Sequence, residues 1–402
     1  MDPHSPTLTQ QVRPGLVLAA ILLIAANLRA LVAAVGPALP IIAADTGLSA
    51  TAQGVLVALP VAAFAVFSPM TAAVAVRRGT ERMLLFALIV LAAGAVLRSL
   101  PVPAADLWPV FIGTAAIGGA MAVGNVLLPV LTHKAFPSRV SVVTGHYIAV
   151  QSVVAALASM LTVPLVLWLG SWRLAIGLWG LFVLAALVTW RPRMGVAPQP
   201  APSDPSVSPP TVERPSVWRT PLAWQVATYF GLQSSAFYIL LSWLPSVEQD
   251  IGVSAEAAGE HLGVFLLTGI AATQVVPMFL RGQDQRAVAM IPPLGVLLAM
   301  VGLVLVPSLV VLWAALAGFG LSCAMVTSLS LISLRAGHAE LTGRLSSMVQ
   351  GAAYTMVAVA LVAAGFVREV IGPGRHVTAL VAAAAVGLTV LGGWVGRDRT
   401  LA

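Results

Sequence analysis

Charged side chains are scarce in this 402-residue sequence: they make up 9% of it, whereas hydrophobic residues make up 59% and the mean hydropathy is +0.97. Soluble domains carry about 25% charged residues, so this composition excludes an ordinary soluble domain. Apolar runs of about 20 residues, long enough to cross a bilayer as helices, recur along nearly the whole chain. We therefore expect an all-α membrane protein that lies in a lipid bilayer.

Residues that carry catalytic or cofactor chemistry are also few. The single cysteine, Cys323, excludes an intramolecular disulfide. The six histidines are scattered, without the paired carboxylates or cysteines that a metal site needs. No phosphate-binding loop is present, which argues against an ATP-driven pump. We expect no metal, no other cofactor and no enzymatic activity, with a membrane-embedded enzyme as the alternative from another class.

Carboxylates are absent from the predicted middle of the membrane. All 14 Asp and Glu residues fall in tails, loops or the ends of hydrophobic segments. Proton-driven transporters commonly use an intramembrane carboxylate relay, and the sequence offers no obvious candidate for one.

Twelve hydrophobic segments are present, at 15–38, 51–76, 82–100, 107–132, 141–169, 172–190, 220–246, 257–280, 286–306, 309–335, 342–368 and 375–395. Between the sixth and the seventh lies a stretch with eight prolines in 29 residues, which is typical of an extended linker. We predict a cytoplasmic N-terminal tail (1–14), an N-terminal six-helix half (15–190), a cytoplasmic Pro-rich linker (191–219), a C-terminal six-helix half (220–395) and a cytoplasmic C-terminal tail (396–402).

The basic residues give the orientation. On this topology 16 of the 21 Lys and Arg residues fall on the side of the N-terminus, 4 fall on the other side, and Arg29 lies between. Basic residues concentrate in cytoplasmic loops, so we expect both termini in the cytoplasm and a multi-pass protein of a bacterial inner membrane. The net charge of +7 is then explained without a nucleic-acid partner.

The two halves contain an internal repeat. The segment "LPIIAADTGLSATAQG" (39–54) aligns without gaps on "LPSVEQDIGVSAEAAG" (244–259), with eight of sixteen positions identical. A second similarity between the halves relates "RRGTER" (77–82) to "RGQDQR" (281–286). Parallel six-helix repeats are the plan of the major facilitator fold, in which the substrate site lies between two pseudo-symmetric halves near mid-membrane.

Several motifs resemble one branch of the major facilitator superfamily, that of the cyanate and 2-nitroimidazole transporters. They are Asn27 and Arg29 followed by "VGPALP" (35–40), "GNVLLPVLTHKAFP" (124–137), "YFGLQSSAFYILLSWLP" (229–245) and "GRLSSMVQGAAY" (343–354). The resemblance implies a transporter of a small polar or anionic organic solute, working as a monomer by rocking of its halves.

The chain departs from the superfamily pattern at its cytoplasmic loops. The loop with Arg77, Arg78 and Arg82 lacks the usual upstream aspartate, and His133 and Lys134 stand where the family tends to have two basic residues. We assign gating contacts to this loop and its counterpart, with Arg77, Arg78, Arg82, Arg281 and Arg286 as the candidates.

Arg29 is the most informative residue. Fifteen residues from Pro14 at about 1.5 Å each place it about 22 Å along its helix, close to the bilayer centre, where an arginine costs about 2.5–3.5 kcal/mol or more. It has no acidic partner at its depth. Either it binds backbone carbonyls freed by Gly36, Pro37 and Pro40, or its partner is the substrate, and we favour the second interpretation because unpaired intramembrane charge marks a functional site.

Other polar residues are predicted to line the same cavity. Two i, i+4 pairs, one in each half, present a hydroxyl and an amide on one helix face, which suits a small polar ligand or else a hydrogen bond between helices. His146 is the candidate for proton coupling. The full set of substrate-binding candidates is Arg29, Asn27, Asn125, Tyr147, Gln151, Gln233, Tyr238, Gln350 and Tyr354.

The leading hypothesis is a secondary active or facilitative transporter of a cyanate- or nitroimidazole-like compound. A multidrug or metabolite efflux carrier of the same fold is the alternative within transport. A channel fits the repeat less well, because six-plus-six repeats around one central charge favour alternating access.

Overall fold

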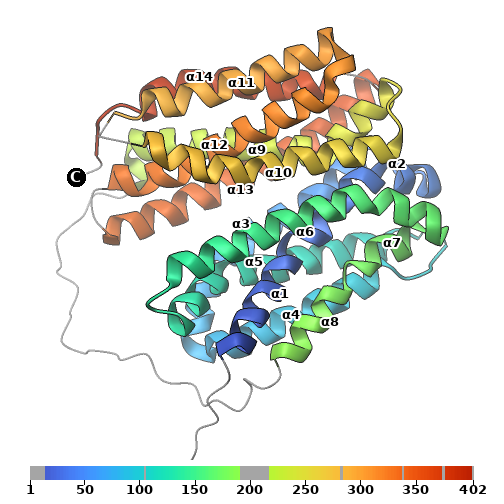
Figure 1. Ribbon diagram of the computed structural model, residues 1–402, viewed down its shortest axis with the longest axis horizontal. Coiled ribbons are helices and arrows are strands. Elements are labelled where there is room, and N and C mark those ends of the chain that lie inside the picture. The colour runs from blue at the N-terminus through green and yellow to red at the C-terminus, as the bar shows by residue number, and fades with distance from the viewer. Residues whose placement is uncertain are drawn as a thin grey trace, which may run out of the picture.

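The computed structural model describes residues 14–103, 106–190, 217–280, 284–336, 339–373 and 376–400, and within these ranges the regular structure is helical (Figure 1). The predicted N-terminal tail and nearly all of the predicted linker lie outside the described residues. The α-helices are Pro14–Ala33 (α1), Val35–Thr46 (α2), Ala50–Arg78 (α3), Thr80–Arg98 (α4), Trp108–Ala135 (α5), Val140–Leu169 (α6), Trp172–Leu178 (α7), Leu181–Trp190 (α8), Pro221–Asp250 (α9), Ala255–Phe279 (α10), Arg286–Leu305 (α11), Val310–Ala336 (α12), Ala339–Ile371 (α13) and His376–Val395 (α14). Short 3-10 turns lie at Val217–Arg219 (η2) and Pro307–Leu309 (η3).

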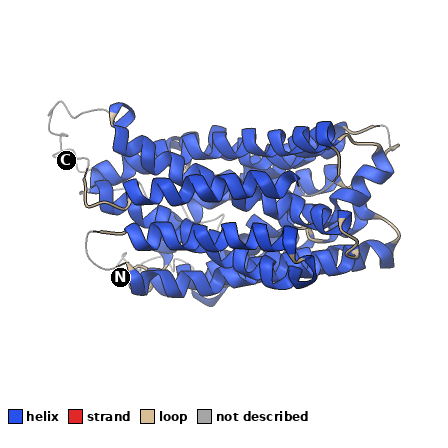
Figure 2. Cartoon of the chain, turned by 90° about the horizontal axis from the view of Figure 1, so that it is seen from above, coloured by secondary structure: helices blue, strands red, loops and turns tan. Residues whose placement is uncertain are grey.

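The helices form two bundles. Helices α1–α8 make the first bundle, in blue to green, and α9–α14 make the second, in yellow to red (Figure 1). Seen from above, the helices run side by side along the long axis of the molecule (Figure 2). Helix α1 packs on α5, α6 and α8 in the same way as α9 packs on α12, α13 and α14, which is the packing expected of a parallel repeat.

Eleven helical segments in the described chain are long and apolar enough to cross a membrane. They include Trp172–Trp190, which α7 and α8 form together. Helix α9 is not among them although it has 30 residues, because polar residues such as Gln233, Ser234 and Ser235 interrupt its apolar surface. Those three side chains are buried inside the protein, so the low hydropathy of α9 reflects burial against other helices.

The first predicted hydrophobic segment (15–38) is divided between two helices, whereas its continuous apolar run predicts one. Helix α1 ends at Ala33 and α2 begins at Val35, with Pro37 in the first turn of α2. Pro37 has no N–H to donate to Ala33 O, and the other carbonyl groups at the end of α1 lose their helical partners because the helix stops there. The guanidinium of Arg98 at the end of α4 donates through Nη1 to Leu31 O at 2.9 Å and so satisfies one of these carbonyls.

The internal repeat is visible as repeated local geometry. Ser49 and Ser254 are the N-caps of α3 and α10, and their hydroxyl oxygens accept from the N–H groups three residues later at 3.3 and 3.2 Å. Gly47 and Gly252, just before these caps, have φ values of 68° and 92°, a left-handed conformation that favours glycine. The repeated residues therefore form the same turn and the same helix start in both halves.

Candidate functional site

Arg29 lies in the interior of the molecule, where α1 faces the second bundle. Its guanidinium carbon is 5.8 Å from the ring centroid of Phe237 on α9, a cation–π contact, and the side chain stays partly exposed. Within the described residues Arg29 makes no ion pair with a carboxylate and no hydrogen bond to a backbone carbonyl. The role of binding carbonyls at the helix break belongs to Arg98, so Arg29 keeps its donors free.

Aromatic rings from both bundles surround this position. Tyr354 on α13 lies 5.4 Å from Phe64 on α3 and 6.2 Å from Phe230 on α9, measured between ring centroids. Phe237 contacts both Tyr238 and Phe265 in the same way, at 5.7 and 5.3 Å. These contacts form two groups of rings, one that joins α3 of the first bundle to α9 and α13 of the second and one that joins α9 to α10.

The hydroxyl groups of Tyr238 and Tyr354 complete the polar part of the site. The guanidinium of Arg29 lies within electrostatic range of both hydroxyl groups, and the Tyr238 hydroxyl lies within range of the Tyr354 hydroxyl. Both tyrosines are partly exposed although they lie deep within the bundles. Arg29, Tyr238 and Tyr354 are therefore three of the nine predicted residues that the fold brings together.

Two further candidates are buried beside this group and are already engaged. Asn27 is 0% exposed and donates from Nδ2 to Leu23 O at 2.7 Å, while its Oδ1 has no partner among the described residues. Gln233 is 1% exposed, donates from Nε2 to Leu321 O at 3.1 Å and accepts the Ser234 hydroxyl on Oε1 at 3.0 Å. In this conformation Gln233 ties α9 to α12.

The remaining candidates are more dispersed. Tyr147 and Gln151 on α6 are both buried, at 8% exposure. Gln350 on α13 donates from Nε2 to Ser346 Oγ at 2.8 Å. Asn125 on α5 is exposed and donates to Met121 O at 3.0 Å. Asn125 and Gln350 bond within their own helices, which leaves their amides able to turn toward a ligand, and no hydrogen bond joins any of the four described side chains to Arg29.

The gating candidates lie at helix ends. Arg77 and Arg78 end α3, Arg82 is in the first turn of α4, and all three are exposed. Arg286 at the start of α11 lies 3.4 Å from the carboxylate of Asp284, and Arg281 falls outside the described residues. The proton-coupling candidate, His146, is exposed near the start of α6.

Close backbone contacts between the two bundles gather at one end of the molecule, which we call the closed end; it carries residues 44–54, 159–173, 241–263 and 361–372. A Cβ atom at Gly54 would lie 2.7 Å from Leu361 O, and one at Gly259 would lie 2.9 Å from Ser159 O. The Thr51 N–H donates to Glu369 Oε2 at 2.8 Å, also across the two bundles. Toward the opposite end, where the C-terminus lies, the ribbons of the two bundles diverge (Figure 1).

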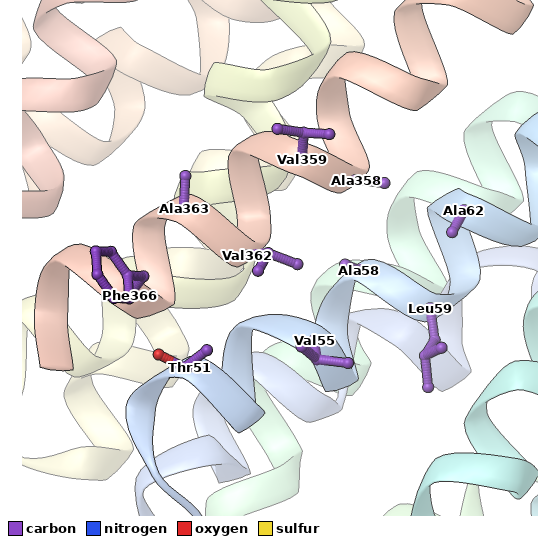
Figure 3. Close-up of a pocket in the computed structure, with 10 residues that line it drawn as sticks. All are labelled: Thr51, Val55, Ala58, Leu59, Ala62, Ala358, Val359, Val362, Ala363 and Phe366. Atoms are coloured by element: carbon purple, nitrogen blue, oxygen red, sulfur yellow. The ribbon is translucent and has the colours of Figure 1, made fainter.

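A separate apolar groove of about 570 Å³ lies between α3 and α13 (Figure 3). Thr51, Val55 and Ala58 line it from one helix, and Val362 and Phe366 line it from the other. Its lining is apolar apart from Thr51, and it contains none of the predicted site residues. We therefore place the candidate site around Arg29.

Sequence reasoning missed two kinds of residue. Phe64, Phe230, Phe237 and Phe265 carry no signal in a sequence in which phenylalanine is equally common on lipid-facing surfaces. Glu248 lies near a helix end, as expected of a carboxylate here, but its side chain is fully buried. Only the packing of α9 on its neighbours reveals that burial.

Comparisons with known proteins agree with this architecture. A model of the Major Facilitator Superfamily matches residues 18–365. The 2-nitroimidazole transporter of Escherichia coli (strain K12) is 35% identical over 385 residues, which is 96% of each chain. The cyanate transport protein CynX of the same strain is 28% identical over 92% of this chain and 94% of that relative.

A solved structure gives the same result for the fold. The D-xylose-proton symporter matches with a TM-score of 0.75 over 96% of this chain and 99% of that chain, at 15% sequence identity. This chain therefore belongs to the Major Facilitator Superfamily and is a multi-pass membrane transporter, similar along nearly its whole length to transporters named for 2-nitroimidazole and cyanate.

Proposed function

We propose that the protein transports a small planar solute, either an anion or a compound with a strong acceptor such as a nitro group, and that Arg29 binds it. The observation that carries the proposal is the Arg29 guanidinium, which lies between the bundles beside Phe237 and has no carboxylate partner in the described part of the chain. A guanidinium stays charged and presents a fork of donors that fits a two-oxygen acceptor.

The surroundings of Arg29 favour a flat ligand. Phe237 and Tyr354 present aromatic surfaces from the second bundle, and a planar ring stacks on such surfaces. The hydroxyl groups of Tyr238 and Tyr354 can each donate one further hydrogen bond to the ligand. The two E. coli relatives, named for 2-nitroimidazole and cyanate, have substrates of this size and polarity.

The proposed topology has twelve spans, with α1–α2 as the first, α7–α8 as the sixth and the largely buried α9 as the seventh. Residues 15–190 and 220–395 form the two halves, and 1–14, 191–219 and 396–402 lie in the cytoplasm of a bacterial cell. The excess of basic residues on this side supports the orientation. The protein works as a monomer, without a cofactor or catalytic activity.

Transport proceeds by alternating access, in which the halves rock about the site. With the orientation above, the closed end faces outward and the present conformation gives access to Arg29 from the cytoplasm. Arg77, Arg78 and Arg82, with Arg281 and Arg286 in the second half, would hold the cytoplasmic ends together in the opposite conformation. Asn27, Asn125, Tyr147, Gln151, Gln233 and Gln350 then complete the cavity, and His146 is its proton-coupling candidate.

Counterflow in proteoliposomes tests this function. Proteoliposomes that contain the purified protein and are preloaded with unlabelled 2-nitroimidazole or cyanate should accumulate the labelled compound transiently. The initial rate of uptake should saturate as the concentration of the labelled compound rises. The Arg29→Met variant should lose this exchange, while Arg219→Ala, which removes an exposed arginine from η2, should retain it. Flux that rises linearly without saturation would indicate a channel and would refute the proposal.

A further inference from the structure

A buried acid–base pair links α9 to α10 at the closed end. The Nδ1 atom of His261 lies 2.7 Å from Oε2 of Glu248. The Glu248 side chain is 0% exposed and the His261 side chain is 14% exposed. The other carboxylate oxygen, Oε1, is also buried and has no hydrogen-bond partner among the described residues.

The position of the pair relates it to the seal between the bundles. His261 lies between Gly259 and Gly263 on α10, and these two glycines pack against Ser159 and Met160 of α6 in the first bundle. The Ser159 hydroxyl donates to Gly259 O at 3.2 Å across the same boundary. The pair therefore braces the segment of α10 that closes this end.

The neighbouring helix α9 makes its own contact with the first bundle. Gly36 on α2 packs directly against the backbone carbonyl of Leu241, two turns before Glu248. The pair thus joins the two helices of the second bundle at the level where both meet α2 and α6. A change in charge at Glu248 acts on both of these contacts.

The other charged groups at the closed end are paired, exposed or, in the case of Arg98 on α4, buried with one donor bound to Leu31 O. Arg368 on α13 binds the Asp250 carboxylate, and Trp172 and Arg173 on α7 bind Asp45 of α2. Glu369 accepts from the Thr51 N–H. The remaining described titratable groups on the surrounding helices, Glu256 and Glu260 on α10 and His376 on α14, are exposed. Glu248 and His261 are therefore the two groups whose protonation changes a buried charge here.

We propose that Glu248 and His261 form a proton-binding site that stabilises the closed end when it holds a proton. With one proton shared, the pair is neutral overall, either as imidazolium and carboxylate or as imidazole and carboxylic acid. When the proton leaves through the partly exposed imidazole, a carboxylate remains buried with one oxygen unpaired. Such a charge is costly without water, and opening this end admits water to it.

The direction of the effect follows from linkage. A proton that binds more tightly to the closed form favours that form as pH falls, and a rise in pH favours opening. Linkage of one proton changes the ratio of closed to open molecules by at most about tenfold per pH unit. The inference rests on the proposed alternating access, but not on the identity of the substrate or on Arg29.

Double electron–electron resonance on the full chain in nanodiscs measures the ratio of closed to open molecules in the absence of substrate. Nitroxides at Ala44→Cys on α2 and Ile371→Cys on α13 report the separation of the bundles, since both positions are exposed at the closed end. The native Cys323 is 2% exposed and its burial protects it from labelling. The long-distance population should grow severalfold as the pH rises from about 6 to about 9, the range around histidine titration.

Three variants in the labelled background decide the origin of this change. Glu248→Gln keeps a hydrogen bond to His261 without a charge and should stay closed at every pH. His261→Gln should move the transition to lower pH, because the carboxylate loses its proton-sharing partner. Glu256→Gln, which removes an exposed carboxylate from the first turn of α10, should behave as wild type.

An unchanged pH profile in both Glu248→Gln and His261→Gln would overturn the inference, as would a wild-type ratio that does not depend on pH. Arg29→Met should keep the wild-type profile, and Glu248→Gln should still bind substrate. Failure of the proton site is in this way separated from failure of the proposed substrate site.

Discussion

Two interior arginines illustrate how similar residues acquire different roles. Arg98 is 2% exposed and donates to Leu31 O at the break between α1 and α2. Arg29 lies in α1 before that break, its guanidinium contacts the ring of Phe237, and it has no acidic partner among the described residues. The sequence predicts that Arg29 is special because it interrupts an apolar run. It does not reveal Arg98, which lies at the end of its segment like an ordinary loop residue.

Replacing Arg29 should stabilise the ligand-free protein. Arg29→Met keeps an unbranched, flexible side chain and removes an interior charge without an acidic partner among the described residues, so the free energy of unfolding should rise by about 1–3 kcal/mol. Thermal unfolding in detergent, followed by a dye for exposed thiols or by light scattering, measures the change. A fall in stability would mean that Arg29 has a structural role.

Replacing Arg98 should have the opposite effect. Arg98→Ala leaves the Leu31 carbonyl unsatisfied and creates a cavity between α4 and α1, which should cost about 2 kcal/mol or more. The same thermal assay compares it directly with Arg29→Met. If both variants shift the unfolding temperature in one direction, the division of roles between the two arginines is wrong.

The tyrosine hydroxyl groups should contribute to binding and little to folding. Tyr354→Phe keeps the contacts of its ring with Phe64 and Phe230 and removes one neutral hydrogen bond to the ligand. Affinity should fall about threefold to tenfold, as measured by calorimetry with 2-nitroimidazole. An unchanged dissociation constant would remove Tyr354 from the site.

At the scale of elements, the sequence repeat corresponds to a repeated turn in the fold. Ser49 and Ser254 form matching N-caps, as their aligned positions indicate. The breaks between α1 and α2 and between α7 and α8 were not predicted, because apolar residues continue across both. Hydropathy measures how apolar a segment is. It does not change where the backbone changes direction within an apolar segment.

Glycines on facing helices should control the closing of the bundles. Gly54→Ala places a methyl group 2.7 Å from Leu361 O and should favour the open form of the closed end. Gly343→Ala is a matched control near the start of α13, since nothing lies within 4 Å of its Cβ position. Spin-label distances between α2 and α13 should lengthen for the first variant and stay unchanged for the second.

At the scale of the whole molecule, composition and the repeat predict an all-helical membrane fold on the major facilitator plan, and the resemblance of the quoted motifs indicates the transporter branch. The positions of Tyr238, Tyr354 and Arg29 around one centre required the packing of α1, α9 and α13, which no local pattern contains. The phenylalanines of the site and the buried Glu248 were missed for the same reason. Polar residues in apolar runs are visible in a sequence, whereas burial and proximity are properties of the assembled bundles.

The central claim is that Arg29 binds the transported solute, and ligand-induced thermal stabilisation tests it most directly. Purified wild type, Arg29→Met and Arg219→Ala are titrated with 2-nitroimidazole, cyanate and chloride, each variant against its own ligand-free unfolding temperature. We predict that 2-nitroimidazole or cyanate stabilises wild type and Arg219→Ala and leaves Arg29→Met unchanged, with chloride inert throughout. Equal stabilisation of all three proteins would contradict the account.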